Sequence, residues 1–82
     1  MSDTQLLCTR QHTPFQYLLY EKIYRDRAGY AVAICRDEKV LAYAEDITDR
    51  KDAAERFLAL ISEGGLEPCH LYDLLEDLLP LR

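Results

Sequence analysis

The sequence predicts an α+β domain, in which a three-stranded antiparallel meander is followed by two helices that pack on one face of the sheet (β-β-β-α-α). Over residues 15–45, short apolar stretches alternate with turn-forming residues, a pattern typical of strands. From residue 49 onward, apolar residues recur at spacings of three and four, which indicates amphipathic helices. A chain of 82 residues with 49 % apolar and 30 % charged composition suits one small globular domain.

The first 14 residues are expected to form a segment of their own, because they mix polar and apolar residues and end at Pro14. They are either a short strand over residues 6–9 or a loosely ordered terminus. Residues 15–82 then form the single α+β domain.

Three strands are predicted, over residues 15–26, 30–36 and 40–45. The first stretch also fits helical spacing, but its tyrosines and the turn that follows it favour a strand. Residues 27–29 supply that turn, and residues 37–39 make a polar hairpin connection.

Two helices follow. Thr48 or Asp49 can cap the first, since a short side-chain oxygen there accepts a hydrogen bond from an N–H of the first turn. The glycines at 64–65 end it. The second helix begins near Pro68, where a missing N–H costs nothing, and ends at Pro80. The apolar stripes of the two helices are Ala53, Ala54, Phe57, Leu58 and Ile61, and then Leu71, Leu74, Leu75, Leu78 and Leu79.

The two faces of the predicted sheet differ in composition. One face, expected to lie under the helices, collects Leu19, Ile23, Val32, Ile34, Leu41 and Tyr43. The other collects Leu18, Tyr20, Tyr24, Ala31, Ala33, Cys35, Val40, Ala42 and Ala44. A solvated face would normally carry more polar residues. We therefore expect a second copy of the chain, another protein or the N-terminal segment to cover it, with Leu18, Tyr20, Tyr24 and Val40 as contact residues; small Ala and amphipathic Tyr also tolerate exposure.

Charge and cysteine content exclude several classes of protein. The net charge is −5, with six basic and five acidic residues in the first 41 positions and four and ten in the rest. Such a chain would repel nucleic acid and anionic membranes, so neither is expected as a partner. The three cysteines are widely spaced and form no C-x-x-C motif, so a reducing cytoplasm is expected instead of a disulfide framework or a zinc finger.

The densest group of chemically active residues lies near the C-terminus. On one helix, His70, Asp73 and Asp77 would share a face and could bind a metal such as iron or manganese. Cys69, in the first turn, could act as a redox sensor. The simpler reading is that the acidic residues are a solvated helix face and that the cysteine packs as a small hydrophobe. No catalytic residue set and no cofactor motif is found.

Three stretches resemble a known family: Gly29-Tyr30-Ala31-Val32, the strand-to-helix junction at residues 45–51, and a C-terminal P-x-H-L-Y-D-x-x-E-D signature at residues 68–77. The family consists of short bacterial proteins that share a domain of unknown function, mainly from anaerobic Gram-positive species. Cys69 stands where that family usually has an aliphatic residue. The resemblance implies a cytosolic bacterial protein and supplies no activity, ligand or catalytic residue.

The sequence therefore predicts a non-enzymatic protein-interaction or regulatory module that binds either a protein partner or a second copy of itself through the second sheet face. The alternative is a small metal- or redox-dependent protein that uses His70, Asp73 and Asp77, or Cys69.

Overall fold

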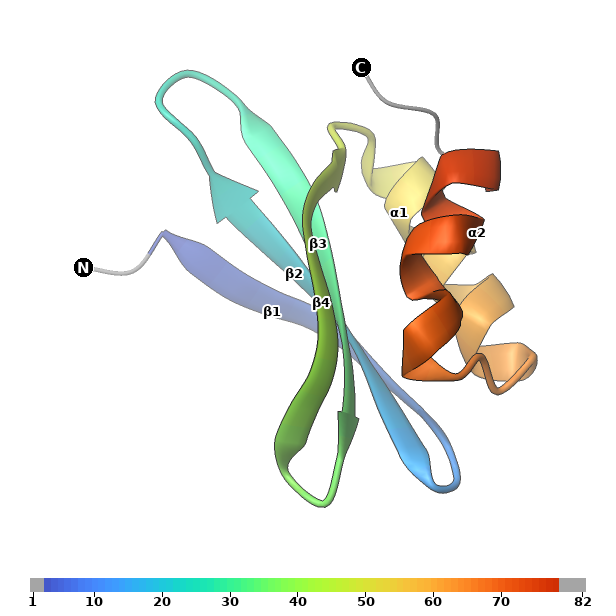
Figure 1. Ribbon diagram of the computed structural model, residues 1–82. Coiled ribbons are helices and arrows are strands. Elements are labelled where there is room, and N and C mark those ends of the chain that lie inside the picture. Colours follow the sequence, from blue (N-terminus) through green and yellow to red (C-terminus); the bar gives the residue numbers. More distant parts are fainter. Residues whose placement is uncertain (1–2, 79–82) are drawn as a thin grey trace.

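A computed structural model describes residues 3–78 of the chain (Figure 1). Its elements in order are β1 (Thr4–His12), β2 (Phe15–Ile23), β3 (Ala28–Arg36), β4 (Lys39–Thr48), α1 (Lys51–Glu63), the 3-10 turn η1 (Pro68–His70) and α2 (Leu71–Leu78). The strands form one antiparallel sheet in the order β1-β2-β3-β4, and both helices lie on the same side of it (Figure 1).

The prediction of three strands is wrong, because the sheet has four. The additional strand is β1, formed by the N-terminal segment, and it pairs with β2 from Thr4 to His12. β1 is an edge strand and most of its residues are exposed, so burial imposes no alternating pattern on its sequence. The register also shifts between Leu6 and Cys8, which places an extra residue in the strand and breaks the period of two.

The β3–β4 hairpin turns at Asp37 and Glu38, whereas the connection was predicted over residues 37–39; Lys39 pairs with Arg36 and belongs to β4. Both residues have positive φ, 52° and 66°, which is the backbone of a type I′ turn. Directly after this turn the register shifts again. Ile34 pairs with Ala42 and Cys35 pairs with Val40, so Leu41 is an extra residue in β4. This irregularity changes which β4 residues face the helices.

The assignment of β4 residues to the two faces is therefore largely inverted. Ala42 and Ala44 pack in the core under the helices, whereas Tyr43 pairs with Ala33 on the opposite face. Strict alternation from Val40 does not include the extra residue Leu41, so it assigns the following residues of β4 to the wrong faces. Val40 lies on the face expected for it, opposite Cys35.

The two predicted helices are present. The predicted cap at Thr48 or Asp49 is wrong, because the N-cap of α1 is Arg50, whose side chain makes no capping hydrogen bond. The Thr48 hydroxyl accepts instead from the N–H of Arg50 at 3.2 Å. α1 ends at Glu63, before Gly64 and Gly65, and Gly65 has a φ of 62°. The second predicted helix is divided into η1 and α2. Leu79 and Pro80, its expected end, lie outside the described residues. Within residues 3–78, no helix has the length and apolar content needed to cross a bilayer.

The hydrophobic core lies between α1, α2 and one face of the sheet. α1 contacts all four strands and α2 contacts β4. The fully buried side chains of the core are Tyr17, Leu19, Val32, Ile34, Leu58, Ile61 and Leu71. Because both helices cover this face, the opposite face of the sheet is left without a second layer (Figure 1). We call it the open face.

Candidate functional site

The open face has a floor of small residues from the central strand β3. Ala31, Ala33 and Cys35 point to this face and are at most 5 % exposed. Larger neighbours on the adjacent strands shield them: Tyr20 pairs with Ala31, and Leu18 and Tyr43 pair with Ala33. These neighbours are themselves partly exposed, so the face presents a continuous apolar surface.

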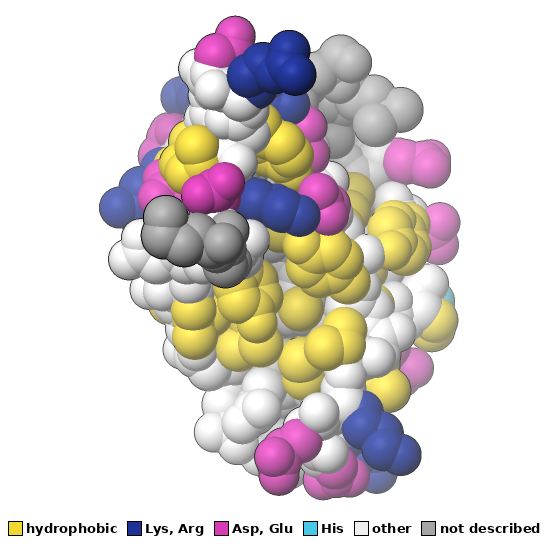
Figure 2. Space-filling model, turned by 90° about the vertical axis from the view of Figure 1, so that its left-hand side faces the viewer, with side chains coloured by type: hydrophobic (Ala, Val, Ile, Leu, Met, Phe, Trp, Pro, Cys, Tyr) yellow, Lys and Arg dark blue, Asp and Glu magenta, His cyan; other side chains and the backbone are white. Residues whose placement is uncertain are grey.

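Figure 2 views the molecule from the side away from the helices and shows hydrophobic side chains gathered in the middle of this surface. Charged side chains of both signs lie at its two ends. The most exposed apolar residues of the open face are Leu6 at 50 %, Val40 at 61 % and Tyr43 at 37 %. Leu6 belongs here because it pairs with Tyr20.

The residues expected to form the contact surface divide into two groups. Leu18, Tyr20 and Val40 lie on the open face. Tyr24 follows the end of β2 and lies at one of the two charged ends, where its hydroxyl donates to Glu45 at 3.1 Å. We call this end, with Lys22, Arg27, Glu45 and Asp46, the charged end. Leu6 and Tyr43 were missed, because the first lies in the unassigned N-terminal segment and the second follows the irregular position in β4.

The charged end is built on two ion pairs and an aromatic ring. Lys22 Nζ donates to Glu45 Oε1 at 2.8 Å, and Arg27 donates to both Asp46 oxygens at 2.7 and 3.0 Å. The Arg27 guanidinium also lies over the Tyr24 ring, 4.8 Å from its centroid, a favourable cation–π distance. This end of the face is therefore internally neutralised.

Gly29 is the base of this charged end. A Cβ atom at this position would lie 2.7 Å from Asp46 Oδ1 and 2.7 Å from Tyr24 Cε2. Real Cβ contacts are longer, so any side chain at position 29 would displace the ring or the carboxylate. The glycine thus permits Tyr24 and Asp46 to pack directly on the backbone of β3.

The ionisation of the charged end follows from these contacts. The hydrogen bond from Lys22 holds the pKa of Glu45 below its ordinary value, and the same bond raises the pKa of Lys22. Burial, followed by the hydrogen bond to Glu45, raises the pKa of Tyr24. In the floor, burial raises the pKa of the Cys35 thiol, which keeps it protonated and unreactive at neutral pH.

A groove of about 570 Å³ separates β4 from η1 and α2 at one edge of the open face. Its lining residues are Val40, Leu41, Ala42, Tyr43, Pro68, Cys69 and Tyr72. The Tyr72 hydroxyl donates to the Tyr43 carbonyl, so α2 occupies part of the hydrogen-bonding edge of β4. β1 is then the more accessible edge of the sheet.

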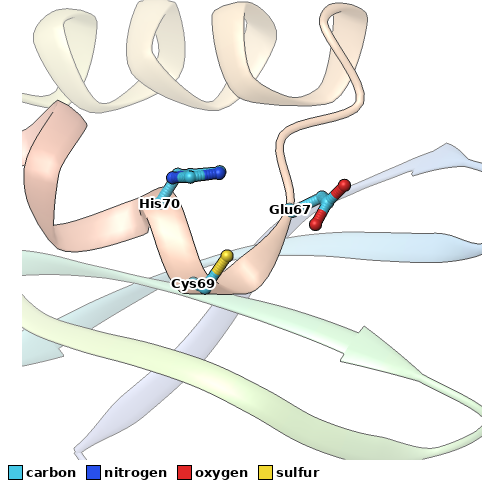
Figure 3. Close-up of side chains that lie close together, drawn as sticks. All are labelled: Glu67, Cys69 and His70. Carbon is cyan, nitrogen blue, oxygen red and sulfur yellow. The ribbon is translucent and has the colours of Figure 1, made fainter.

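The C-terminal candidate residues are arranged differently from the expectation. Cys69 and His70 belong to η1, whereas Asp73 and Asp77 lie on α2 and are exposed. The ligand atoms of Glu67, Cys69 and His70 lie within 4.8 Å of one another (Figure 3). Among residues 3–78, neither Asp73 nor Asp77 belongs to such a group of three. The sequence-based set of His70, Asp73 and Asp77 is thus not brought together, and Glu67 was missed.

Glu67 is the extended residue directly before η1, and the turn folds back on it because the His70 N–H donates to the Glu67 carbonyl at 3.0 Å. The proline at position 68 and the Gly64-Gly65 pair before it are the signals for a separate turn.

Residues 4–81 match the family described as "Family of unknown function (DUF6514)". No curated protein and no solved structure matches. The matched residues include β1 as well as the segments that carry the resemblance noted in the sequence. The chain therefore belongs to this family of unknown function, DUF6514.

Proposed function

We propose that the protein is a non-enzymatic interaction module that pairs with a second copy of itself through the open face. One observation carries the proposal: the open face is a continuous apolar surface that no described element covers. Residues 4–12 lie beside β2 as an edge strand instead of across the face, so within the described chain the N-terminal segment is not its cover.

The distribution of charge favours a second copy over a strongly charged partner. Residues 3–50, which form the sheet and its turns, contain seven basic and eight acidic residues. Residues 51–78, which form the helical layer, contain two basic and seven acidic residues. Two copies that meet through their open faces therefore place the acidic layers on opposite outer sides, where the distance between them reduces repulsion.

The chemistry of the face suits a two-fold contact. Tyr20 and Tyr43 offer large apolar area with a polar tip, a combination that is enriched at protein interfaces. Lys22, Glu45, Arg27 and Asp46 at the charged end are already paired within one chain, so these four charges keep their partners beside the interface. The same patch meeting itself gives a closed dimer.

Sedimentation velocity of the full chain over a range of concentrations tests the proposal. The chain offers a matched pair of variants, because Leu6 on the open face is 50 % exposed and Leu60 on α1 is 51 % exposed. We expect the wild type and Leu60→Asp to form dimers and Leu6→Asp to remain monomeric. A wild-type monomer at about 100 μM, a concentration at which a weak specific dimer with a micromolar Kd is populated, contradicts self-pairing.

A second variant distinguishes the face from the edge of the sheet. Leu6 lies on β1, so its substitution could also disturb a dimer formed by pairing two β1 edges. Val40 lies on the opposite edge strand and points to the open face. If Val40→Asp is monomeric, the dimer forms through the open face. If Val40→Asp still forms dimers while Leu6→Asp is monomeric, the dimer forms by pairing of two β1 edges.

A further inference from the structure

The turn between α1 and α2 brings three metal-binding groups together. Glu67, Cys69 and His70 contribute a carboxylate oxygen, a sulfur and an imidazole nitrogen, all within 4.8 Å of one another. Figure 3 shows these side chains around the short η1 turn. We propose that the protein binds a divalent transition metal ion of the zinc type at this turn, with these three residues as ligands.

The backbone of the turn is held in place without the metal. The His70 N–H donates to the Glu67 carbonyl at 3.0 Å, and Pro68 fixes φ between them. The preceding Leu66 is anchored twice, through its N–H to the Ile61 carbonyl at 3.0 Å and through its carbonyl to the Tyr17 hydroxyl at 2.9 Å. The site is therefore largely preorganised, and binding requires movement of side chains alone.

All three side chains are available as ligands. Each residue is exposed, and within residues 3–78 none of the three side chains is engaged in a hydrogen bond or ion pair. Ligand atoms around tetrahedral zinc are separated by about 3.3–3.8 Å, given bond lengths of about 2.0–2.3 Å. The group is wider than this by about 1 Å, which rotation of exposed side chains can close.

The donor set and the surrounding charge select the class of ion. One thiolate, one imidazole and one carboxylate suit zinc, cobalt or nickel, whereas magnesium and calcium prefer oxygen donors throughout. The helical layer that contains the turn has five more acidic than basic residues, which favours a cation. Three protein ligands leave a fourth position for water or for a group from another molecule.

Titration of the reduced, tag-free full chain with Co²⁺ tests the site, because a cobalt–thiolate bond gives a near-ultraviolet charge-transfer band that carboxylates alone do not produce. We expect this band with one equivalent of Co²⁺ and its loss on addition of Zn²⁺. Cys69→Ser should abolish the band, and Glu67→Gln and His70→Gln should each weaken Co²⁺ binding by at least ~10-fold.

One variant provides a matched control. Cys8→Ser removes a thiol from β1, away from the turn. It should bind Co²⁺ as the wild type does. Absence of a thiolate band from the wild type, or equal loss in Cys8→Ser and Cys69→Ser, overturns the proposal. Circular dichroism confirms that each variant is folded, and sedimentation in EDTA separates this site from pairing through the open face, which needs no metal.

Discussion

The hydroxyl of Tyr17, a fully buried residue of β2, donates a 2.9 Å hydrogen bond to the carbonyl of Leu66, 49 positions further along the chain. The bond joins the sheet to the segment between α1 and η1. That segment has left the α1 hydrogen-bonding pattern, so the carbonyl needs a partner from elsewhere in the fold. The turn with the proposed metal ligands is thus positioned by a residue of the core.

Tyr17→Phe removes this donor while keeping the ring. We expect a loss of about 1–2 kcal/mol in the free energy of unfolding, because a partly buried carbonyl loses its partner. Urea denaturation of dilute protein measures the change. Tyr20→Phe is the matched control, since Tyr20 is on the same strand but its hydroxyl has no hydrogen bond within residues 3–78; an equal loss in both variants would contradict the assigned role.

Leu71→Ala tests whether α2 is part of the core. Leu71 is fully buried, and truncation of such a side chain costs about 2–5 kcal/mol. For a domain of this size that is a large part of the total stability. Leu60→Ala, on the exposed side of α1, should change stability by less than about 0.5 kcal/mol. If thermal and urea unfolding show Leu71→Ala to be as mild as Leu60→Ala, α2 does not contribute to the core.

The β3–β4 turn offers a stabilising change. Glu38 has a φ of 66°, a conformation that costs a residue with a side chain about 1–2 kcal/mol and costs glycine nothing. Glycine loses more backbone entropy on folding, about 0.5–1 kcal/mol, so Glu38→Gly should stabilise the protein by about 0.5–1 kcal/mol. Lys39→Gly, one position later in β4, should destabilise it. Melting temperatures that fall in both variants would contradict the turn geometry.

The charged end predicts a specific pH dependence. The pKa of Glu45 is lowered in the folded chain by the hydrogen bond from Lys22, so its ion pair stabilises the fold at pH values above the ordinary carboxyl pKa of about 4.3. This contribution is lost as the pH falls through the lower, folded-state pKa. Carboxyl NMR titration should place the Glu45 midpoint below its ordinary value.

Two variants act as reciprocal controls for this titration. Lys22→Gln should raise the Glu45 midpoint part of the way, since the Tyr24 hydroxyl still donates to the carboxylate. Arg50→Gln should leave Glu45 unchanged and raise the midpoint of Asp52, whose pKa is lowered chiefly by its hydrogen bond from Arg50. A Glu45 midpoint that does not respond to Lys22→Gln would show that the ion pair is not formed in solution.

Local patterns in the sequence were enough to predict the helices and strands that bury one regular face. The apolar stripe of α1, the glycines that end it, the apolar run of β3 and the position of the turn between β3 and β4 were all predicted. In each, the signal lies within a few residues, because burial of one face imposes a period of 3.6 or 2 on neighbouring positions. The apolar open face, including Leu18, Tyr20 and Val40, followed from the same reasoning.

Tertiary structure decided what such periodicity does not contain. β1 is an exposed edge strand with an irregular register, so it has no buried face that its sequence pattern could reveal. Its hydrogen-bonded pairing with β2 is what holds it as a strand. The extra residue Leu41 sets which side of the sheet Tyr43 occupies. Glu67 lies beside Cys69 and His70 at the turn before α2, and Tyr17, whose hydroxyl anchors the residue before Glu67, is 49 positions away from that residue. These features depend on contacts between distant segments. The local sequence permits several conformations, and hydrogen bonding and packing in the folded chain determine which one is adopted.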